Sequence, residues 1–158
     1  MVSWSELEKR TPAIAEAGRK LIHQHNIGLA YLATVRKDGA PRLHPICPTV
    51  FEGGLYALIG PTHKQRDLIR DGRFALHSFP CPDVDDEFLV MGRARMIDDA
   101  AFRARVLADL KSKGMTSTED ELLFEFQIDR AMHAAYPGGH GTWPPKYAVW
   151  TEKQGVDI

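Results

Sequence analysis

The stretch LIGPTHKQRDLIRDGRFALH, residues 58–77, has the pattern of a strand, a tight turn, a short helix and a second strand. Gly60-Pro61 interrupts the apolar run of the first strand, and Thr62 follows at a position that suits a helix cap. The expected helix has an apolar side, and a turn pair ends it before the second strand. Leu68 and Ile69 form the apolar side, and Asp71-Gly72 is the turn pair.

The first turn of this expected helix is basic, with His63, Lys64 and Arg66 close together. A helix start presents unpaired backbone N–H groups and a partial positive charge. A hydroxyl at Thr62 and cationic side chains beside those groups would complete a binding site for a phosphate. The alternative is that these are ordinary solvated residues on a short surface helix. The sequence alone leaves both interpretations open.

The segment before this stretch reads as extended chain with two turns. Residues 27–36 are rich in apolar and β-branched side chains, and Lys37–Ala40 is a turn pattern. Residues 41–51 resume the extended chain, and Glu52–Gly54 turns it again before the strand that ends at Ile59. The pattern predicts a three-stranded antiparallel meander and argues against a doubly wound α/β sheet.

Two prolines, Pro45 and Pro48, lie inside the second of these strands. Proline cannot donate to a strand ladder, so we expect this strand at a sheet edge or interrupted by a bulge. The missing bonds would leave neighbouring backbone groups free for a planar heteroaromatic ligand. Equally, the prolines would serve only to prevent edge-to-edge aggregation.

The remaining sequence predicts helices around further strands. A helical segment at about residues 3–25 is divided at Pro12, and a second helix follows Asp98-Asp99 and ends near Gly114. Further strands are expected at residues 73–79, 87–97 with a bulge at Gly92, 122–131 and 146–151. The fold class is therefore mainly β (α+β), a six- to seven-stranded antiparallel barrel, closed or nearly closed, with flanking helices.

Composition narrows the functional classes. The 158 residues fit a single domain, 1–158, and 20 Lys and Arg against 21 Asp and Glu give a net charge of -1. That balance favours neither nucleic acid nor a membrane as partner, and the absence of a long apolar run predicts a cytoplasmic protein. Cys47 and Cys81 are expected as free thiols, and the histidine spacing indicates no metal site.

Three stretches together resemble the flavin-binding split β-barrel family that includes pyridoxamine 5'-phosphate oxidase. They are ATVRKDGAPRLHPI, LYALIGPTHKQRDLIRDGRFAL and FLVMGRARMI, and the resemblance covers about residues 27–130. It implies a split β-barrel and a homodimer with two FMN molecules in clefts between the subunits. Some branches of the family bind the deazaflavin F420 or haem instead.

The resemblance also implies site residues. Its phosphate cluster falls on Thr62, His63 and Lys64, where a histidine replaces the family's arginine. Its ring-contacting glutamine falls on Glu87, a carboxylate that would disfavour negative charge on a reduced flavin. Arg42 or Arg66 could supply the missing phosphate contacts. The further residues carried over are His44 and Thr49 near the phosphate; His44, Pro45, Ile46, Leu58 and Ile59 against the ring; and Trp143 and Lys146 from the second subunit.

These expectations favour an FMN-dependent oxidoreductase that acts on a small-molecule substrate. One alternative is an F420-dependent reductase. Another is a non-catalytic flavin- or haem-binding protein, with His133 or His140 as an axial ligand of the haem iron. Two residues keep ordinary interpretations as well: Trp143 as a core or dimer-interface aromatic, and Cys47 as inert packing rather than a redox-active thiol.

Overall fold

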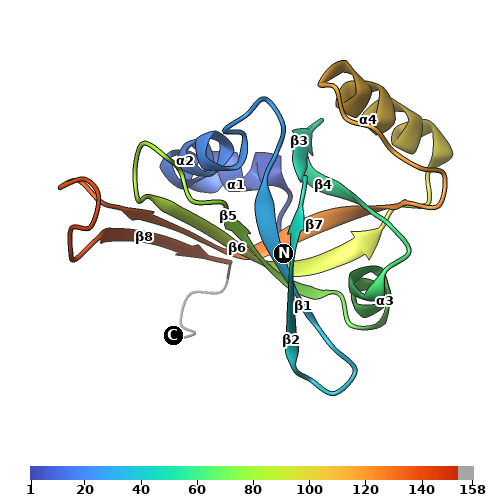
Figure 1. The fold of residues 1–158 in the computed structure, drawn as a ribbon, viewed down its shortest axis with the longest axis horizontal. Helices are drawn as coiled ribbons and strands as arrows, with labels where there is room; N and C mark the ends of the chain where they lie inside the picture. Colours follow the sequence, from blue (N-terminus) through green and yellow to red (C-terminus); the bar gives the residue numbers. More distant parts are fainter. Residues whose placement is uncertain (153–158) are drawn as a thin grey trace.

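Eight β-strands and four α-helices make up the described part of the chain, residues 1–152 of a computed structural model (Figure 1). Residues 153–158 of the predicted domain lie outside that range. The elements, in chain order, are α1 (Trp4–Arg10), α2 (Pro12–Ile22), β1 (Ala30–Val35), β2 (Pro41–Ile46), β3 (Thr49–Phe51), β4 (Gly54–Ile59), α3 (His63–Arg70), β5 (Arg73–Ser78), β6 (Glu87–Met96), α4 (Ala100–Ser112), β7 (Leu122–Ala135) and β8 (Lys146–Thr151).

The sheet is antiparallel and strongly curled. Its strand order is β2-β1-β5-β6-β7-β4-β3, and β8 pairs with β7 beside this path. β2 and β3 are the two ends of the path, yet only Cys47 and Pro48 separate them in sequence. Three Cα-to-Cα steps span at most about 11 Å. The sheet must therefore curl until its two ends approach each other, which gives the half-barrel.

The predicted three-stranded meander is wrong, because residues 41–51 divide between two hairpins. β2 pairs with β1, from Ala30 opposite Ile46 to Val35 opposite Pro41, whereas β3 pairs with β4. The break falls at Pro48, which has no N–H to continue a ladder. This division raises the strand number to eight from the six or seven expected. The expected edge position is confirmed for β2, which ends the strand path.

β7 is the longest strand and connects the two parts of the sheet. It pairs with β6 over most of its length, with β4 through its first residues and with β8 through its last. The predicted bulge is confirmed, since the β6–β7 register shifts between Met91 and Gly92. A Cβ atom at Gly92 would lie 1.9 Å from the Gln127 carbonyl oxygen, so only glycine fits this close approach.

The helices cover the sheet as their patterns predict. Ser3 caps α1 in a capping box with Glu6, and Pro12 begins α2. Both helices lie over β5–β7 in Figure 1, and the fully buried Trp4 ring meets Phe88 edge-on at 5.9 Å between centroids. α4 packs on a second, smaller core made of Tyr56, Val106, Leu110 and Leu123.

α3 attaches to the sheet mainly through polar groups. Leu68 is buried as expected, but the prediction for Ile69 is wrong, because its side chain is 59% exposed. The inner side of α3 carries Gln65 and Asp67 instead. The Gln65 Nε2 group donates to the Ile59 carbonyl oxygen at 2.7 Å. Hydrogen bonds therefore supply the part of the attachment between α3 and the sheet that Ile69 was expected to supply.

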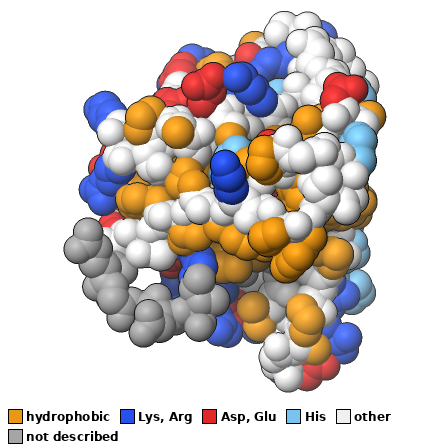
Figure 2. Space-filling view, turned by 90° about the vertical axis from the view of Figure 1, so that its left-hand side faces the viewer, with side chains coloured by type: hydrophobic (Ala, Val, Ile, Leu, Met, Phe, Trp, Pro, Cys, Tyr) orange, Lys and Arg blue, Asp and Glu red, His pale blue; other side chains and the backbone are white. Residues whose placement is uncertain are grey.

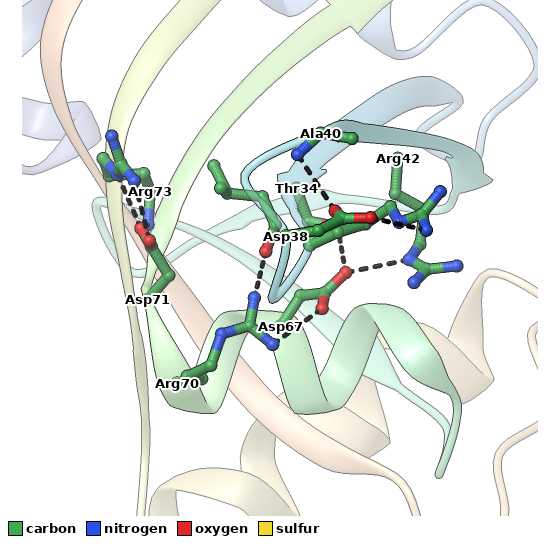
Figure 3. A network of polar contacts seen from close by, with 10 residues as sticks. Thr34, Asp38, Ala40, Arg42, Asp67, Arg70, Asp71 and Arg73 are labelled. Atoms are coloured by element: carbon green, nitrogen blue, oxygen red, sulfur yellow. Dashed lines mark hydrogen bonds and ion pairs between the residues drawn. The ribbon is translucent and has the colours of Figure 1, made fainter.

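Asp67 is the centre of this polar contact (Figure 3). Its side chain is 4% exposed and accepts hydrogen bonds from Thr34 Oγ1 at 3.0 Å, Arg42 Nε at 2.8 Å and Arg70 Nη1 at 3.1 Å. Burial by itself raises the pKa of Asp67, but the donors outweigh burial and hold the pKa below its ordinary value. The ionised carboxylate thus fastens β1, β2 and α3 to one another.

We expect Asp67→Asn to lower the free energy of unfolding by about 2–3 kcal/mol at pH 7, because partly buried donors lose their ionic acceptor. The pKa of Asp67 is lowered in the folded state, so its contribution is present above the ordinary value of 3.8 and lost as pH falls through the folded value. Urea denaturation at pH 7 and at pH 3 measures both effects.

The matched control for this prediction is Asp38→Asn in the β1–β2 turn, which faces α3 across the basic pocket described below. Asp38 is 58% exposed and pairs with Arg36, so its loss should cost at most about 1 kcal/mol. Equal losses for the two variants would contradict the structural role given to Asp67.

Candidate functional site

A basic pocket of about 490 Å³ lies between the β1–β2 turn and α3. Five of its lining side chains are Lys or Arg, against two carboxylates. One of those carboxylates, Asp67, is already held by Arg42 and Arg70. The remaining excess of positive charge suits an anion. The lining residues are Arg36, Lys37, Asp38, Arg42, His63, Arg66, Asp67 and Arg70.

The start of α3 borders this pocket and is open to a ligand. Thr62 occupies the cap position as predicted, but its Oγ1 donates to the Gly60 carbonyl oxygen at 3.2 Å and makes no side-chain cap. The first-turn N–H groups therefore have no side-chain acceptor from Thr62, and the helix itself supplies none. Within residues 1–152, the side chains of Lys64 and Arg66 form no hydrogen bond or ion pair.

His44 lies beside this group on β2. Its Nε2 atom is shielded from solvent and has no hydrogen-bond partner among the described residues. Burial, together with the positive charges of Lys64 and Arg42, holds the pKa of His44 below its ordinary value. The imidazole is therefore neutral at pH 7. An unpaired buried nitrogen costs about 1–3 kcal/mol, a cost that a bound hydrogen-bonding group would remove.

The structure thus brings His44, His63 and Lys64 into one electrostatic neighbourhood, since both of the latter lower the pKa of His44. The other residues predicted on the same side lie elsewhere. Ile46 and Ile59 belong to the main core, Leu58 packs on the core under α4, and Pro45 is exposed opposite Tyr31. Thr49 is buried on β3, where its Oγ1 accepts from Lys113 Nζ at 3.3 Å.

Glu87 and Trp143 meet in a second pocket of about 500 Å³. It lies where the loop between β5 and β6 faces the β7–β8 turn, and half of its lining residues are aromatic or acidic. Lys146, expected beside Trp143, is exposed at the start of β8 opposite Ala135 and does not line this pocket. The lining residues are Tyr31, His77, Ser78, Phe79, Pro80, Cys81, Val84, Asp85, Asp86, Glu87, Tyr136, Gly141, Thr142 and Trp143.

Two aspartate–histidine pairs hold the walls of this second pocket together. His140 Nδ1 contacts Asp85 Oδ1 at 2.5 Å, and the Gly141 N–H donates to Asp85 Oδ2 at 2.6 Å. His133 Nε2 lies 3.2 Å from Asp86 Oδ2, and the N–H of Tyr136 donates to Asp86 Oδ1 at 2.9 Å. We call these two contacts the clasps. The Asp85 contact joins the loop between β5 and β6, here called the acidic loop, to the β7–β8 turn, and the Asp86 contact joins it to the end of β7.

The contact between Asp85 and His140 alters the ionisation of both residues. The hydrogen bond to Asp85 and its charge raise the pKa of His140. The Gly141 N–H and then His140 lower the pKa of Asp85. The pair is therefore a charged one at mildly acidic pH.

Sequence reasoning missed several residues that the structure places in these sites. Asp67 gave a weak indication, since it stands between Arg66 and Arg70 on one short helix, a spacing typical of ion pairs. The pairing of Asp85 with His140 gave none, because 55 residues separate them.

Cysteine, metal and membrane features add no site. Cys47 and Cys81 are free thiols, and burial raises the pKa of Cys47, which favours its interpretation as inert packing. Among residues 1–152, no group of three or more His, Cys, Asp or Glu side chains is arranged to hold a metal ion. Nor does any helix within that range combine the length and apolar character needed to cross a membrane.

Comparison with known proteins gives matches in structure only. No family model matches the sequence, and no curated protein matches it either. Among solved structures, a NimC/NimA family protein from Clostridium acetobutylicum matches with a TM-score of 0.61 and 19% identity, covering 88% of this chain and 93% of that one.

Two further structures have the same architecture. HutZ, the haem storage protein from Vibrio cholerae, matches with a TM-score of 0.59 and 17% identity over 86% of this chain and 93% of its own. A protein from Clostridium acetobutylicum, related to general stress protein 26 of B. subtilis (pyridoxinephosphate oxidase family), matches with a TM-score of 0.64 and 10% identity over 88% and 94%. The likeness to pyridoxamine 5'-phosphate oxidase-like proteins is thereby confirmed for the fold.

We expect His140 to titrate above its ordinary value of 6.5 in the native protein and closer to that value in Asp85→Asn. Because the folded-state pKa is raised, the contribution of His140 is fully present below 6.5 and lost as pH rises through the folded value. A histidine NMR titration measures the change. Asp86→Asn is the control and should leave His140 unchanged; an unchanged His140 in Asp85→Asn would contradict the pairing.

Proposed function

We propose that this protein is an FMN-dependent oxidoreductase that acts on a small molecule. The observation that carries the proposal is the open, basic start of α3, with the unpaired Nε2 of His44 beside it. The split-barrel fold supports it as well, because the neighbours in structure include a protein of the pyridoxinephosphate oxidase family. The residues present fit the cofactor. Its anionic phosphate would bind the basic start of α3, and its ring would form a hydrogen bond with Nε2 of His44.

In this proposal, the chain supplies binding and orientation. The first-turn N–H groups of α3, with Lys64 and His63, hold the phosphate. Arg66 adds positive charge from the adjoining pocket. Neutral His44 gives one hydrogen bond to the bound cofactor through Nε2. FMN, when bound, supplies hydride transfer at its ring, and the protein tunes its electrostatics.

Two alternatives have specific support. An F420-dependent reductase would use the five Lys and Arg side chains of the basic pocket to hold the acidic tail of the cofactor. A haem-binding protein is supported by the likeness to the haem storage protein. In that case Asp85 would orient His140, whose Nε2 would coordinate the iron, as carboxylates commonly do for metal-bound histidines.

We infer that the chain forms a homodimer through the outer face of its sheet. Directly opposite residues on paired strands share a face, and one row crosses six strands. Within it Val149 is 43% exposed, and nearby Leu43 and Tyr147 are 64% and 58% exposed. Figure 2, which views the β8 side, shows hydrophobic side chains gathered in a band. The row is Pro45, Tyr31, His77, Leu89, Met132 and Val149.

Such a largely apolar surface is typical of an interface between proteins. A second copy covering this face would place two clefts at the subunit boundary. The interface and the phosphate contacts are separate parts of the proposal, so each has its own test.

We expect Lys64→Ala to weaken FMN binding by about 1–3 kcal/mol, because it removes a charge-assisted hydrogen bond to phosphate. Calorimetric titration of FMN into both proteins measures this difference. Lys111→Ala in the last turn of α4 is the control and should bind like the native protein. Equal affinities for Lys64→Ala and the control would refute the phosphate assignment. Titration with F420, and a Soret band on adding haem, test the two alternatives.

We expect Val149→Glu to shift the protein from dimer to monomer, because a charge would be buried in the apolar face. Ile69→Glu is the matched control, since Ile69 is an exposed aliphatic residue on α3, away from that face. Sedimentation equilibrium of the three proteins decides the matter. A native protein that is monomeric at tens of micromolar would rule out the proposed interface.

A further inference from the structure

We propose that the second pocket, between the acidic loop and the β7–β8 turn, binds a planar aromatic molecule that carries a positive charge. Binding of such a molecule does not require the cofactor. The further inference that this molecule is the substrate rests on the proposed redox function. The argument uses the size of the pocket, its aromatic walls and its charge.

The pocket has the size and character of a small-molecule site. Its volume of about 500 Å³ falls within the range usual for such ligands. Tyr31 and Phe79 stack in its wall, with ring centroids 4.3 Å apart and planes 26° apart. Tyr136 contributes another ring, and Trp143 lies at the pocket with 78% of its surface exposed. An exposed indole beside other aromatic rings offers a face on which a flat ligand can stack.

The charge of the pocket selects a cation. Asp85, Asp86 and Glu87 all line it, and none of its described lining residues is Lys or Arg. The clasps occupy the first two carboxylates. Glu87, by contrast, is only partly exposed and forms no hydrogen bond or ion pair within residues 1–152. Burial and the negative charge of Glu87 raise the pKa of Tyr136, which therefore remains a neutral phenol facing the ligand.

A histidine also belongs to the wall. His77 lines the pocket, and its Nδ1 lies 2.7 Å from the Ser78 carbonyl oxygen, so this nitrogen acts as the donor. In the neutral ring Nε2 is then an acceptor. Aromatic faces attract cations through their quadrupole, and a nearby carboxylate adds to that attraction. An anionic or purely apolar ligand would gain only the stacking.

The two pockets of the chain therefore have opposite charge. The pocket at α3 has an excess of cations and suits an anion, whereas this one suits a cation. Glu87 was carried over from the resemblance as a contact of the flavin ring. Its position among two further carboxylates favours a positively charged ligand over a reduced flavin that bears negative charge.

Three probes of similar shape test the proposal: N-methylquinolinium, which is cationic; 1-methylnaphthalene, which is neutral; and 1-naphthoate, which is anionic. Binding to the full chain is measured by calorimetry and by quenching of tryptophan fluorescence. We expect the cation to bind about three- to thirty-fold more tightly than the neutral probe, the range expected for cation–π contacts. The anion should bind more weakly than both.

Two variants locate the site. Glu87→Gln keeps the shape of a side chain that makes no hydrogen bond, and it should reduce the preference for the cation several-fold, leaving the part that the aromatic faces supply. Trp143→Ala should weaken all stacking probes several-fold. Glu121→Gln, on the loop before β7, is the control and should bind like the native protein. Circular dichroism confirms that each variant is folded.

A cation that binds no better than naphthoate, or a preference that is undiminished in Glu87→Gln, would overturn the proposal. Repeating the titrations with and without saturating FMN separates this proposal from the proposed function. If FMN fails to bind while the cation preference holds, only the redox function is lost. If FMN binds and the cation preference is absent, only the present inference is lost.

Discussion

The fold depends on one covalent constraint, the two-residue link between β2 and β3. These strands lie at opposite ends of a seven-strand path, yet Cys47 and Pro48 alone connect them. A flat sheet cannot satisfy that connection, so the sheet curls into a half-barrel. Gly28 reflects the resulting closeness, because a Cβ atom there would lie 1.6 Å from the Pro48 carbonyl oxygen. Curling also brings the inner side of β2 against α3, where Arg42 reaches Asp67 and His44 comes close to Lys64.

The charges of the chain are arranged so that two sites of opposite sign share one sheet. Near neutrality overall, the protein concentrates cations at α3 and carboxylates at the loop before β6. β1 contributes to both, since Thr34 on its inner face bonds Asp67 and Tyr31 on its outer face lines the acidic pocket. Tyr31 and His77 also belong to the row of residues on the proposed dimer face. The acidic pocket therefore opens beside the proposed dimer face, where a second subunit would help to enclose it.

Much of the fold could be predicted from sequence, because the decisive patterns are local. The division at Pro12, the bulge at Gly92 and the last strand were all visible in short stretches. The prediction of a meander failed because a proline indicates where the hydrogen bonding between strands breaks, but not which strands pair beyond the break. The prediction that Ile69 faces the core failed because Asp67 and Gln65 hold α3 on the sheet. A buried carboxylate cannot be recognised from sequence, because its donors Thr34 and Arg42 are distant along the chain. The cluster of residues at the start of α3 was predictable because Thr62, His63 and Lys64 are adjacent in the sequence. The acidic pocket was not, because it joins residues from Tyr31 to Trp143.

The clasps between the acidic loop and the β7–β8 turn have a consequence for the speed of ligand exchange. They are polar contacts with partly exposed members, so they break and re-form far faster than the packed core unfolds. A molecule enclosed there would leave at a rate set by this local opening rather than by global unfolding. Residence time would accordingly be longest where His140 is charged and would shorten in alkaline solution, even for a ligand whose own ionisation never changes.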